Sequence, residues 1–377
     1  MRIGIVCYPT YGGSGVIATE LGKALAERGH QVHFISYALP MRLDGFVGNV
    51  FYHEVEMANY PLFEFPLYTP ALASKIVEVA RFEKLEIVHA HYAIPHAISA
   101  FLAREVLGKH LTVITTLHGT DITLVGLEPS YLPMLKFSIE RSDGVTAVSR
   151  FLKEKTLTNF GIEKEIQVIP NFVDTEKYRR VRCAEIRNQF ARPGEKVLIH
   201  VSNFRSVKRV PDVIRIFHEI EKKVQSTLLL AGDGPDRSVC EHLVRELGIQ
   251  DHVRFLGKQQ ELVPLLSSSD LMLMPSQSES FGLSALEAMA CEVPVISTSV
   301  GGLPELQVHG STGFIAEIGD IDRMARYALD LLGNEPKMAM FREASRKRAV
   351  QFDVKKIVGE YESYYVECLN GKGARGE

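Results

Sequence analysis

Hydrophobic and polar residues alternate along the chain in blocks whose lengths predict strands and helices in turn. Residues 3–8 (IGIVCY) form a short apolar run rich in β-branched side chains, which is typical of a buried strand. Residues 15–29 follow with apolar side chains at helical spacing, and residues 31–37 (QVHFISY) form a second apolar run. A strand, a glycine-rich loop, a helix and a strand in this order predict the building block of a parallel, doubly wound sheet.

The same alternation continues along the rest of the chain in two series. The first series has further predicted strands at 86–92, 112–119 and 144–149, and helices at 97–107 and 132–143. The second series has predicted strands at 197–204, 227–235, 253–257, 271–276 and 293–299, with helices between them, the first of which starts at Pro211. The two series predict two α/β domains, each built on a doubly wound parallel sheet.

The alternation breaks at residues 166–174, where Pro170 and Asn171 interrupt the pattern. The segment 51–70 is aromatic and broken by prolines. It is interpreted either as a packed surface loop or as the acceptor-side wall of a cleft between the domains. The predicted domains are 1–168 and 169–352, followed by a helix at 353–377 that reaches back towards the first domain.

The composition is that of an ordinary soluble protein of 377 residues, of which 46% are hydrophobic and 24% are charged. A net charge of −3 argues against a general nucleic-acid-binding protein, which needs a basic surface. No apolar run reaches the roughly 18 residues of a membrane span, and the amino terminus lacks the regions of a signal peptide. The five cysteines are scattered, which fits reduced thiols and neither a zinc site nor a disulfide framework. We therefore expect a cytoplasmic protein without nucleic-acid or membrane partners.

Candidate ligand contacts gather at the carboxyl ends of strands in the first series, the edge at which doubly wound sheets bind ligands. Residues 11–15 (YGGSG) let the backbone approach a ligand, and the helix that follows offers N–H groups to an anion. The alternative is a tight turn that packs the helix on the strand. His118 ends a strand, and we expect its side chain to point into open space and contact a ligand. Tyr92 and Thr116 share this edge, with a satisfied core hydroxyl as the rival interpretation for both.

A basic segment follows the first strand of the second series. Residues 202–209 (SNFRSVKR) place three cations at a strand's carboxyl end, which suits a diphosphate because arginine grips two oxygens and lysine adds a point charge. A solvated turn is the alternative. Residues 232–235 (GDGP) and 257–258 (GK) each follow a strand and are turn signals by their chemistry.

Two glutamates, Glu279 and Glu287, stand eight positions apart in residues 276–291 (SQSESFGLSALEAMAC). A helix is expected to begin around Phe281-Gly282 with Ser280 as its N-cap, so that one glutamate lies before the helix and the other inside it. Because these environments differ, a symmetric acid–base pair is not favoured. The start of the helix can take a phosphate, and a carboxylate beside it can accept hydrogen bonds from sugar hydroxyls.

This E-x7-E element resembles that of the retaining glycosyltransferases of family four, which include glycogen, sucrose and mannosyl transferases. HGTD at 118–121, the glycine-rich first loop, SNFRSVKR and AGDGP support the resemblance over nearly the whole chain. It implies the GT-B fold, an α/β architecture of two facing Rossmann-like domains with an interdomain cleft. The strings CYPTYGGSGVIATELGKALAERGH, HAHYAIPHA, TTLHGTDIT and HVSNFRSVKR are most similar to the branch that transfers N-acetylglucosamine from UDP to L-malate in bacillithiol biosynthesis.

The resemblance implies that the second domain holds the donor, UDP-N-acetylglucosamine. Glu287 would bind the ribose, Glu279 the 3- and 4-hydroxyls of the sugar, and Lys258, by its backbone, the uracil. Asn203 would also lie at the donor, at a position where many relatives carry arginine. The remaining implied contacts are the backbone of Phe281, Gly282 and Leu283 beside the sugar and phosphate, Arg205 and Lys208 on the departing diphosphate, Gly13, Ser14 and Gly15 closing over it, and His118 near the reacting carbon.

The acceptor implied by the resemblance, malate, is a dianion and requires cations in its pocket. Arg42 and Lys136 of the first domain are the candidates, with hydroxyls from Ser14, Tyr92 and Thr116. No DxD-type dyad is evident in the sequence, so we expect a reaction that needs neither a metal nor another cofactor. The alternatives are another acceptor (an inositol phosphate, a sugar or a lipid) or a sugar-nucleotide epimerase of the same fold. A homodimer is left open.

Overall fold

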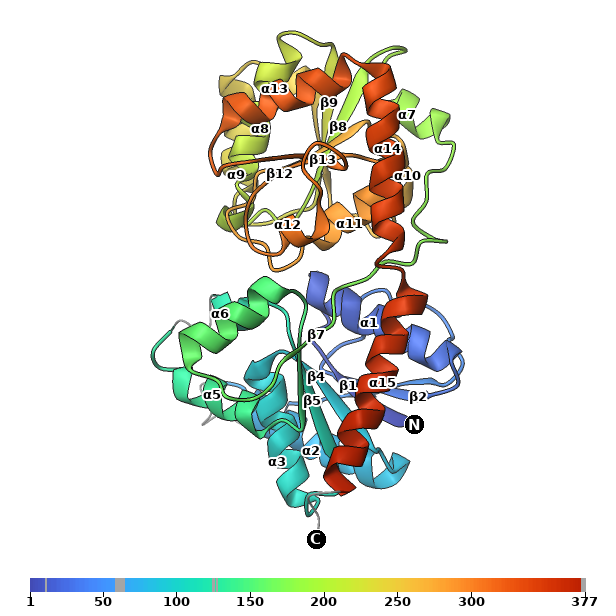
Figure 1. Cartoon of the computed structure of the whole chain (residues 1–377), viewed down its shortest axis with the longest axis vertical. Coiled ribbons are helices and arrows are strands. Elements are labelled where there is room, and N and C mark those ends of the chain that lie inside the picture. The colour runs from blue at the N-terminus through green and yellow to red at the C-terminus, as the bar shows by residue number, and fades with distance from the viewer. Residues whose placement is uncertain (11, 58–64, 124–125, 127, 374–377) are drawn as a thin grey trace. The chain divides into compact units, whose positions relative to one another are not determined.

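The computed structural model describes residues 1–10, 12–57, 65–123, 126 and 128–373. The chain divides into two compact units, unit 1 (Met1–Asn171 with Val354–Glu377) and unit 2 (Phe172–Asp353). Each unit contains one parallel β-sheet with helices packed on it (Figure 1). In the described part of the chain, no helix combines the length and the apolar character needed to cross a membrane.

The sheet of unit 1 has seven parallel strands in the order β3-β2-β1-β4-β5-β6-β7. In chain order, β1, β2 and β3 follow one another towards one edge of the sheet. Strand β4 then pairs with the other side of β1. The carboxyl ends of β1 and β4 are therefore the switch point at which ligands bind in such sheets. The strands are β1 (Arg2–Val6), β2 (Gln31–Ser36), β3 (Val50–Glu54), β4 (Ile87–His91), β5 (Thr112–Leu117), β6 (Gly144–Ala147) and β7 (Gln167–Val168).

The helices of unit 1 bury apolar stripes against this sheet. Helices α2 and α3 pack on each other and share a core with β1, β2 and β4. Helix α15 contacts α1 and β5, and the hydroxyl of its Tyr365 lies 2.7 Å from His89 Nδ1, which fixes this C-terminal helix to unit 1. The helical elements are α1 (Gly13–Glu27), α2 (Tyr68–Glu83), η1 (Ala93–Ala97), α3 (Ile98–Val106), α4 (Thr120–Thr123), α5 (Leu132–Arg141), α6 (Arg150–Phe160) and α15 (Val354–Gly373).

The sheet of unit 2 has six parallel strands in the order β10-β9-β8-β11-β12-β13, wound in the same way as unit 1. Its switch point therefore lies at the carboxyl ends of β8 and β11. The strands are β8 (Lys196–Val201), β9 (Ser226–Ala231), β10 (Val253–Gly257), β11 (Leu271–Met274), β12 (Val295–Thr298) and β13 (Gly313–Ala316).

The helices of unit 2 pack in a series, α9 on α8, α8 on α13, α13 on α14 and α14 on α11. Helices α8, α9, α13 and α14 share one apolar core with the sheet. The helical elements are α7 (Ala184–Phe190), η3 (Ser206–Lys208), α8 (Val210–Glu221), α9 (Arg237–Glu246), η4 (Gln250–His252), α10 (Val263–Ser267), α11 (Leu283–Ala290), α12 (Leu303–Leu306), α13 (Ile321–Leu332) and α14 (Glu335–Val350).

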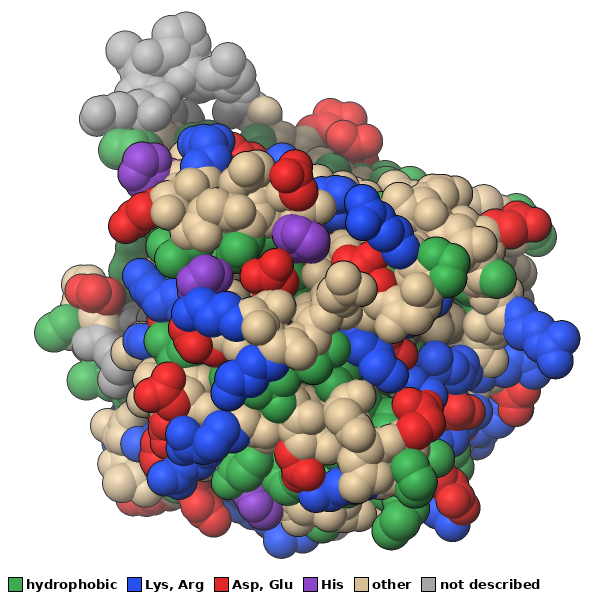
Figure 2. All heavy atoms as spheres, turned by 90° about the horizontal axis from the view of Figure 1, so that it is seen from above, with side chains coloured by type: hydrophobic (Ala, Val, Ile, Leu, Met, Phe, Trp, Pro, Cys, Tyr) green, Lys and Arg blue, Asp and Glu red, His purple; other side chains and the backbone are tan. Residues whose placement is uncertain are grey.

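The predicted α/β class is confirmed, but three strands, β3, β7 and β13, escaped prediction. Strand β3 lies in the segment that was expected to be a loop or a wall, and it pairs in parallel with β2 at the edge of the sheet. Residues 58–64 of that segment lie outside the described residues. Strand β7 lies where the alternation breaks, and strand β13 pairs in parallel with β12; like β3, both are edge strands. On the face in Figure 2, charged side chains of both signs are interspersed, as the small net charge suggests.

Candidate active site

At the switch point of unit 1, the loop after β1 lies against the end of β4. The hydroxyls of Ser14 and Tyr92 are 2.8 Å apart, so the structure joins two of the predicted acceptor contacts. Gly15 permits the tight loop, since a Cβ there would lie 2.7 Å from the carbonyl oxygen of Tyr8. Gly13 begins α1, so its backbone is part of the N-terminal turn that was predicted to face the phosphates.

His118 lies on the same edge, one residue after β5. Its Nε2 is 2.8 Å from Nδ1 of His91, and the two rings stack with centroids 5.0 Å apart. The ring of Tyr92 lies 5.4 Å away. The expectation that the His118 side chain points into open space is therefore wrong, because the ring is half-buried against other rings. Burial lowers the pKa of His118 to about 3, so the imidazole is uncharged at neutral pH.

Asp121 holds this edge together, a role that was not predicted from the sequence. Its Oδ1 accepts hydrogen bonds from the backbone N–H of His118 (3.3 Å) and Gly119 (2.9 Å), and its Oδ2 accepts one from Ala93 (3.1 Å). Burial raises the pKa of Asp121 to about 6, although these N–H groups oppose the rise. The signal in the sequence was an acid three residues after a strand-ending histidine.

Thr116 is fully buried inside unit 1. Its hydroxyl lies 2.6 Å from His89 Nε2 and 2.6 Å from the hydroxyl of Thr146. These bonds favour the rival interpretation of a satisfied core hydroxyl, and we assign Thr116 to the core rather than to the acceptor.

The two predicted acceptor cations lie in different places. Lys136 Nζ donates a hydrogen bond to the carbonyl oxygen of Gly161 at 2.9 Å. Gly161 ends α6 and precedes β7, so Lys136 lies at the amino edge of the sheet, and the structure does not bring it to Ser14 and Tyr92. Arg42 lies on the segment between β2 and β3, half-buried, with a left-handed φ of 65°. Its role as an acceptor contact stays a prediction.

At the switch point of unit 2, two residues that were predicted to act separately form an ion pair. Lys208 Nζ lies 2.6 Å from Glu279 Oε1, and Ser276 Oγ donates to the same oxygen at 3.0 Å. The Glu279 side chain is only 8% exposed, so this pair is largely shielded from water. An ammonium group has three donors, so Lys208 keeps two that can reach phosphate oxygens.

A pair of glycines, which were not predicted as site residues, fixes the backbone of Glu279. Gly302 N–H donates to the Glu279 carbonyl oxygen at 3.0 Å. A Cβ on Gly301 would lie 1.7 Å from that oxygen, and Gly301 has a left-handed φ of 59°. Glycine is therefore required where this turn approaches Glu279.

Helix α11 begins at Leu283, and its N-cap is Gly282 with φ 96°. The expectation that Ser280 caps the helix is wrong, because the chain turns through a conformation that glycine tolerates and serine disfavours. Phe281 is buried and packs edge-on against Phe352 at 5.6 Å, which leaves only its backbone for the predicted ligand contact. Glu287 lies inside the helix and is buried.

The basic segment after β8 is covered by the GDGP turn. A Cβ on Gly234 would lie 2.1 Å from the carbonyl oxygen of Asn203, so this glycine allows the two loops to touch. Among the described residues, no hydrogen-bond partner is found for the buried Oδ1 of Asn203. Arg205 is exposed, and Lys258 follows β10 on the surface.

His200 on β8 is bonded to the start of the basic segment, and it was not predicted as a site residue. Its Nε2 lies 2.8 Å from the hydroxyl of Ser202, and its Nδ1 lies 2.8 Å from the carbonyl oxygen of Leu273. Burial lowers the pKa of His200 to about 4, with a further lowering by Lys208. The ring is neutral at neutral pH and ties β8 to β11.

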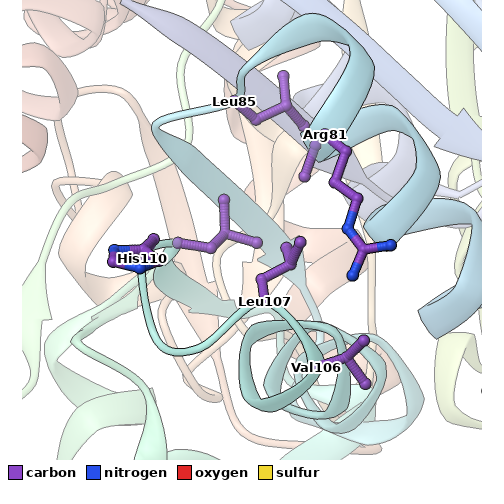
Figure 3. Close-up of a pocket in the computed structure, with 7 residues that line it drawn as sticks. Arg81, Leu85, Val106, Leu107 and His110 are labelled. Atoms are coloured by element: carbon purple, nitrogen blue, oxygen red, sulfur yellow. The ribbon is translucent and has the colours of Figure 1, made fainter.

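A separate hollow of about 320 Å³ opens at the ends of α2 and α3 (Figure 3). None of the predicted site residues lines it. Its lining is apolar except for Arg81 and His110: Ala80, Arg81, Leu85, Val106, Leu107, His110 and Leu111.

Comparison with known proteins decides the family. The chain is 48% identical to the N-acetyl-alpha-D-glucosaminyl L-malate synthase of Bacillus anthracis, over 99% of each chain. The chain is a member of glycosyltransferase family 4. The model of that family, "Glycosyltransferase Family 4", matches residues 11–177, and the model "Glycosyl transferases group 1" matches residues 183–348.

Solved structures of low identity share the fold of this glycosyltransferase. Anabaena HepE in complex with UDP and glucose has a TM-score of 0.83 at 20% identity, covering 97% of this chain and 100% of HepE. The sucrose-phosphate synthase of Thermosynechococcus elongatus has a TM-score of 0.80 at 21% identity, covering 98% and 100%. The predicted GT-B fold is thereby confirmed.

Proposed function

We propose that this enzyme transfers N-acetylglucosamine from UDP-N-acetylglucosamine to the hydroxyl of L-malate, with retention of configuration at the anomeric carbon. The observation that carries the proposal is the 48% identity to the Bacillus anthracis synthase over 99% of both chains. Identity at this level extends through both units, so it includes the segments that would bind the donor and those that would bind the acceptor.

In this proposal the donor lies at the switch point of unit 2. Glu279 accepts hydrogen bonds from the sugar hydroxyls, Glu287 binds the ribose, and the N-terminal N–H groups of α11 face the diphosphate. Arg205 and the two remaining donors of Lys208 neutralise the phosphates. The further donor contacts are Asn203, the backbones of Lys258, Phe281, Gly282 and Leu283, and the loop of Gly13, Ser14 and Gly15.

The proposed reaction proceeds by attack of the acceptor on the face that the leaving group departs from. The bond between C1 and the β-phosphate oxygen breaks, a bond between C1 and the malate oxygen forms, and the hydroxyl proton passes to the departing phosphate. In this proposal Glu279 orients the sugar and is not the nucleophile of a double displacement; Lys208 and Ser276 position its carboxylate through Oε1. Catalysis then comes from positioning and charge stabilisation, and no metal is required.

The proposed acceptor site lies at the switch point of unit 1. Ser14 and Tyr92 supply hydroxyls, neutral His118 contacts the sugar near the reacting carbon, and Arg42 is the candidate cation for a malate carboxylate. Lys136 is not assigned to it, because its Nζ donates to the Gly161 carbonyl oxygen. Thr116 is not assigned to it either, because its hydroxyl is bonded to His89 and Thr146 in the core.

An acceptor screen tests the proposal. The enzyme is incubated with UDP-N-acetylglucosamine and L-malate, D-malate, inositol 3-phosphate or a simple sugar, and UDP release is followed. We expect rapid release with L-malate and little with the others. If release is fastest with inositol 3-phosphate, the acceptor proposed here is wrong and the family assignment still holds. Release without any acceptor would favour an epimerase or hydrolase.

A further inference from the structure

Two histidines and a glutamate meet on the outer side of unit 1, on elements that hold none of the candidate active-site residues. His33 lies on β2, His53 on the edge strand β3, and Glu83 is the last residue of α2. Their ligand atoms all lie within 4.8 Å of one another. From this geometry we propose that His33, His53 and Glu83 bind one divalent transition-metal ion, with Zn²⁺ as the best match, and that the ion fastens β3 to the unit.

The register of the strands brings the two rings together. In the β2–β3 pairing Ile35 lies opposite His53. His33 is two residues before Ile35 on β2, so His33 and His53 point to the same face of the sheet. The closest nitrogens, His33 Nδ1 and His53 Nε2, are 3.0 Å apart. Two nitrogens bound to a tetrahedral zinc ion at about 2.0–2.1 Å lie roughly 3.3–3.4 Å from each other, so only a small movement would admit the ion.

Helix α2 carries the third ligand to this face. Its buried residues Ile76, Val79 and Ala80 pack in the core that includes Ile35 of β2. Glu83 continues the same helical stripe, three and four positions further on, which directs its carboxylate towards the sheet. Two imidazoles and one carboxylate form a donor set that zinc accepts, with a water molecule completing four-coordination.

The surroundings of His33 hold its ring in place. Its side chain is 1% exposed, and its Nδ1, the nitrogen that would bind the ion, faces His53 Nε2. Phe51 stacks on the ring at 4.8 Å, which holds the imidazole plane in place.

Charged side chains of both signs surround the two rings. Glu83 supplies a negative charge to both rings, Arg2 adds a positive charge near His33, and Lys75 near His53 is paired with Glu78 at 2.9 Å.

Cobalt titration tests the site directly, because Co²⁺ in a site of low coordination absorbs visible light and Zn²⁺ displaces it. The full-length chain, free of any polyhistidine tag, is stripped with EDTA, freed of chelator and titrated with Co²⁺. We expect one equivalent to bind, with a visible spectrum that Zn²⁺ removes, and a melting temperature that rises with added Zn²⁺.

Variants locate the ion. His53→Gln and Glu83→Gln each remove one ligand and should weaken binding by about tenfold or more, with loss of the spectrum. His242→Gln changes an exposed histidine on α9 of the other unit and should behave as wild type. Circular dichroism of the metal-free variants confirms that they fold.

Three results would overturn the proposal: wild-type protein without a one-to-one cobalt spectrum, a spectrum unchanged in His53→Gln or Glu83→Gln, or a spectrum lost in His242→Gln. The wild-type titration shows whether the protein binds one metal ion even if a variant fails to fold. Turnover of the stripped enzyme at low temperature should equal that of the zinc-loaded enzyme, because the site is structural.

Discussion

At the scale of single residues, the structure gives two glutamates eight positions apart different surroundings, with Glu279 before α11 and Glu287 inside it. This difference could be predicted because both lie in one short stretch with a helix start between them. The ion pair of Glu279 with Lys208 could not, because it joins residues 71 positions apart at the ends of β8 and β11. Asp121 and His200 were missed because each has one partner on a distant element, Ala93 for Asp121 at 28 positions and Leu273 for His200 at 73 positions.

Replacing Glu279 by glutamine should abolish most of the transfer without abolishing UDP binding. The amide keeps the size of the side chain but loses the charge that pairs with Lys208 and accepts bonds from sugar hydroxyls. We expect kcat to fall by about 100-fold or more, while UDP affinity, measured by calorimetry, changes little. Glu246→Gln, at an exposed position on α9, is the control. A normal turnover rate in Glu279→Gln would contradict the role given to Glu279.

At the scale of elements, the central strands and the longer helices were predictable from their apolar patterns. The loops that shape the site were not. The start of α11 was misplaced because Gly282 adopts a left-handed conformation, which a propensity for serine caps does not foresee. Strands β3, β7 and β13 were missed, and all three are edge strands. In each case contacts with a neighbouring strand, and not local preference, decide the conformation.

Gly301→Ala tests whether the glycine turn positions Glu279. Gly301 and Gly310 both have left-handed φ angles, of 59° and 76°, so alanine at either should destabilise by about 1–2 kcal/mol. Only Gly301 faces an obstacle, the carbonyl oxygen of Glu279 at 1.7 Å, whereas a Cβ on Gly310 meets nothing within 4 Å. We expect Gly301→Ala to lose additional stability and to lower kcat, and Gly310→Ala to keep its kcat. Equal behaviour of the two variants would rule out this positioning.

At the scale of the whole molecule, the buried histidines should make the enzyme sensitive to acid. Burial lowers the pKa of His89 and His118 to about 3 and of His96 and His200 to about 4. The unfolded chain takes up these protons below about pH 6.5, whereas the folded chain resists them until pH 3–4. Their contribution to stability is therefore complete above pH 6.5 and is lost as the pH falls, by up to about 1.4 kcal/mol per histidine and pH unit.

Thermal unfolding at about pH 7.5 and pH 5.0 checks this sign. The melting temperature should be lower at the acid pH, and most strongly for the transition of unit 1, which holds three of the four histidines. Asp121 acts in the opposite direction, since its pKa is raised to about 6, but it is one group against several. A higher melting temperature at the acid pH would show that these rings are protonated in the folded enzyme.

The central claim concerns the bond that the enzyme makes, and analysis of the product tests it most directly. The enzyme is supplied with UDP-N-acetylglucosamine and L-malate in the presence of EDTA, and the product is examined by mass spectrometry and proton NMR. We predict one N-acetylglucosamine joined to one malate through the malate hydroxyl, with the small anomeric coupling of the α configuration. A β-linked product, or free N-acetylglucosamine with unchanged malate, would contradict the account.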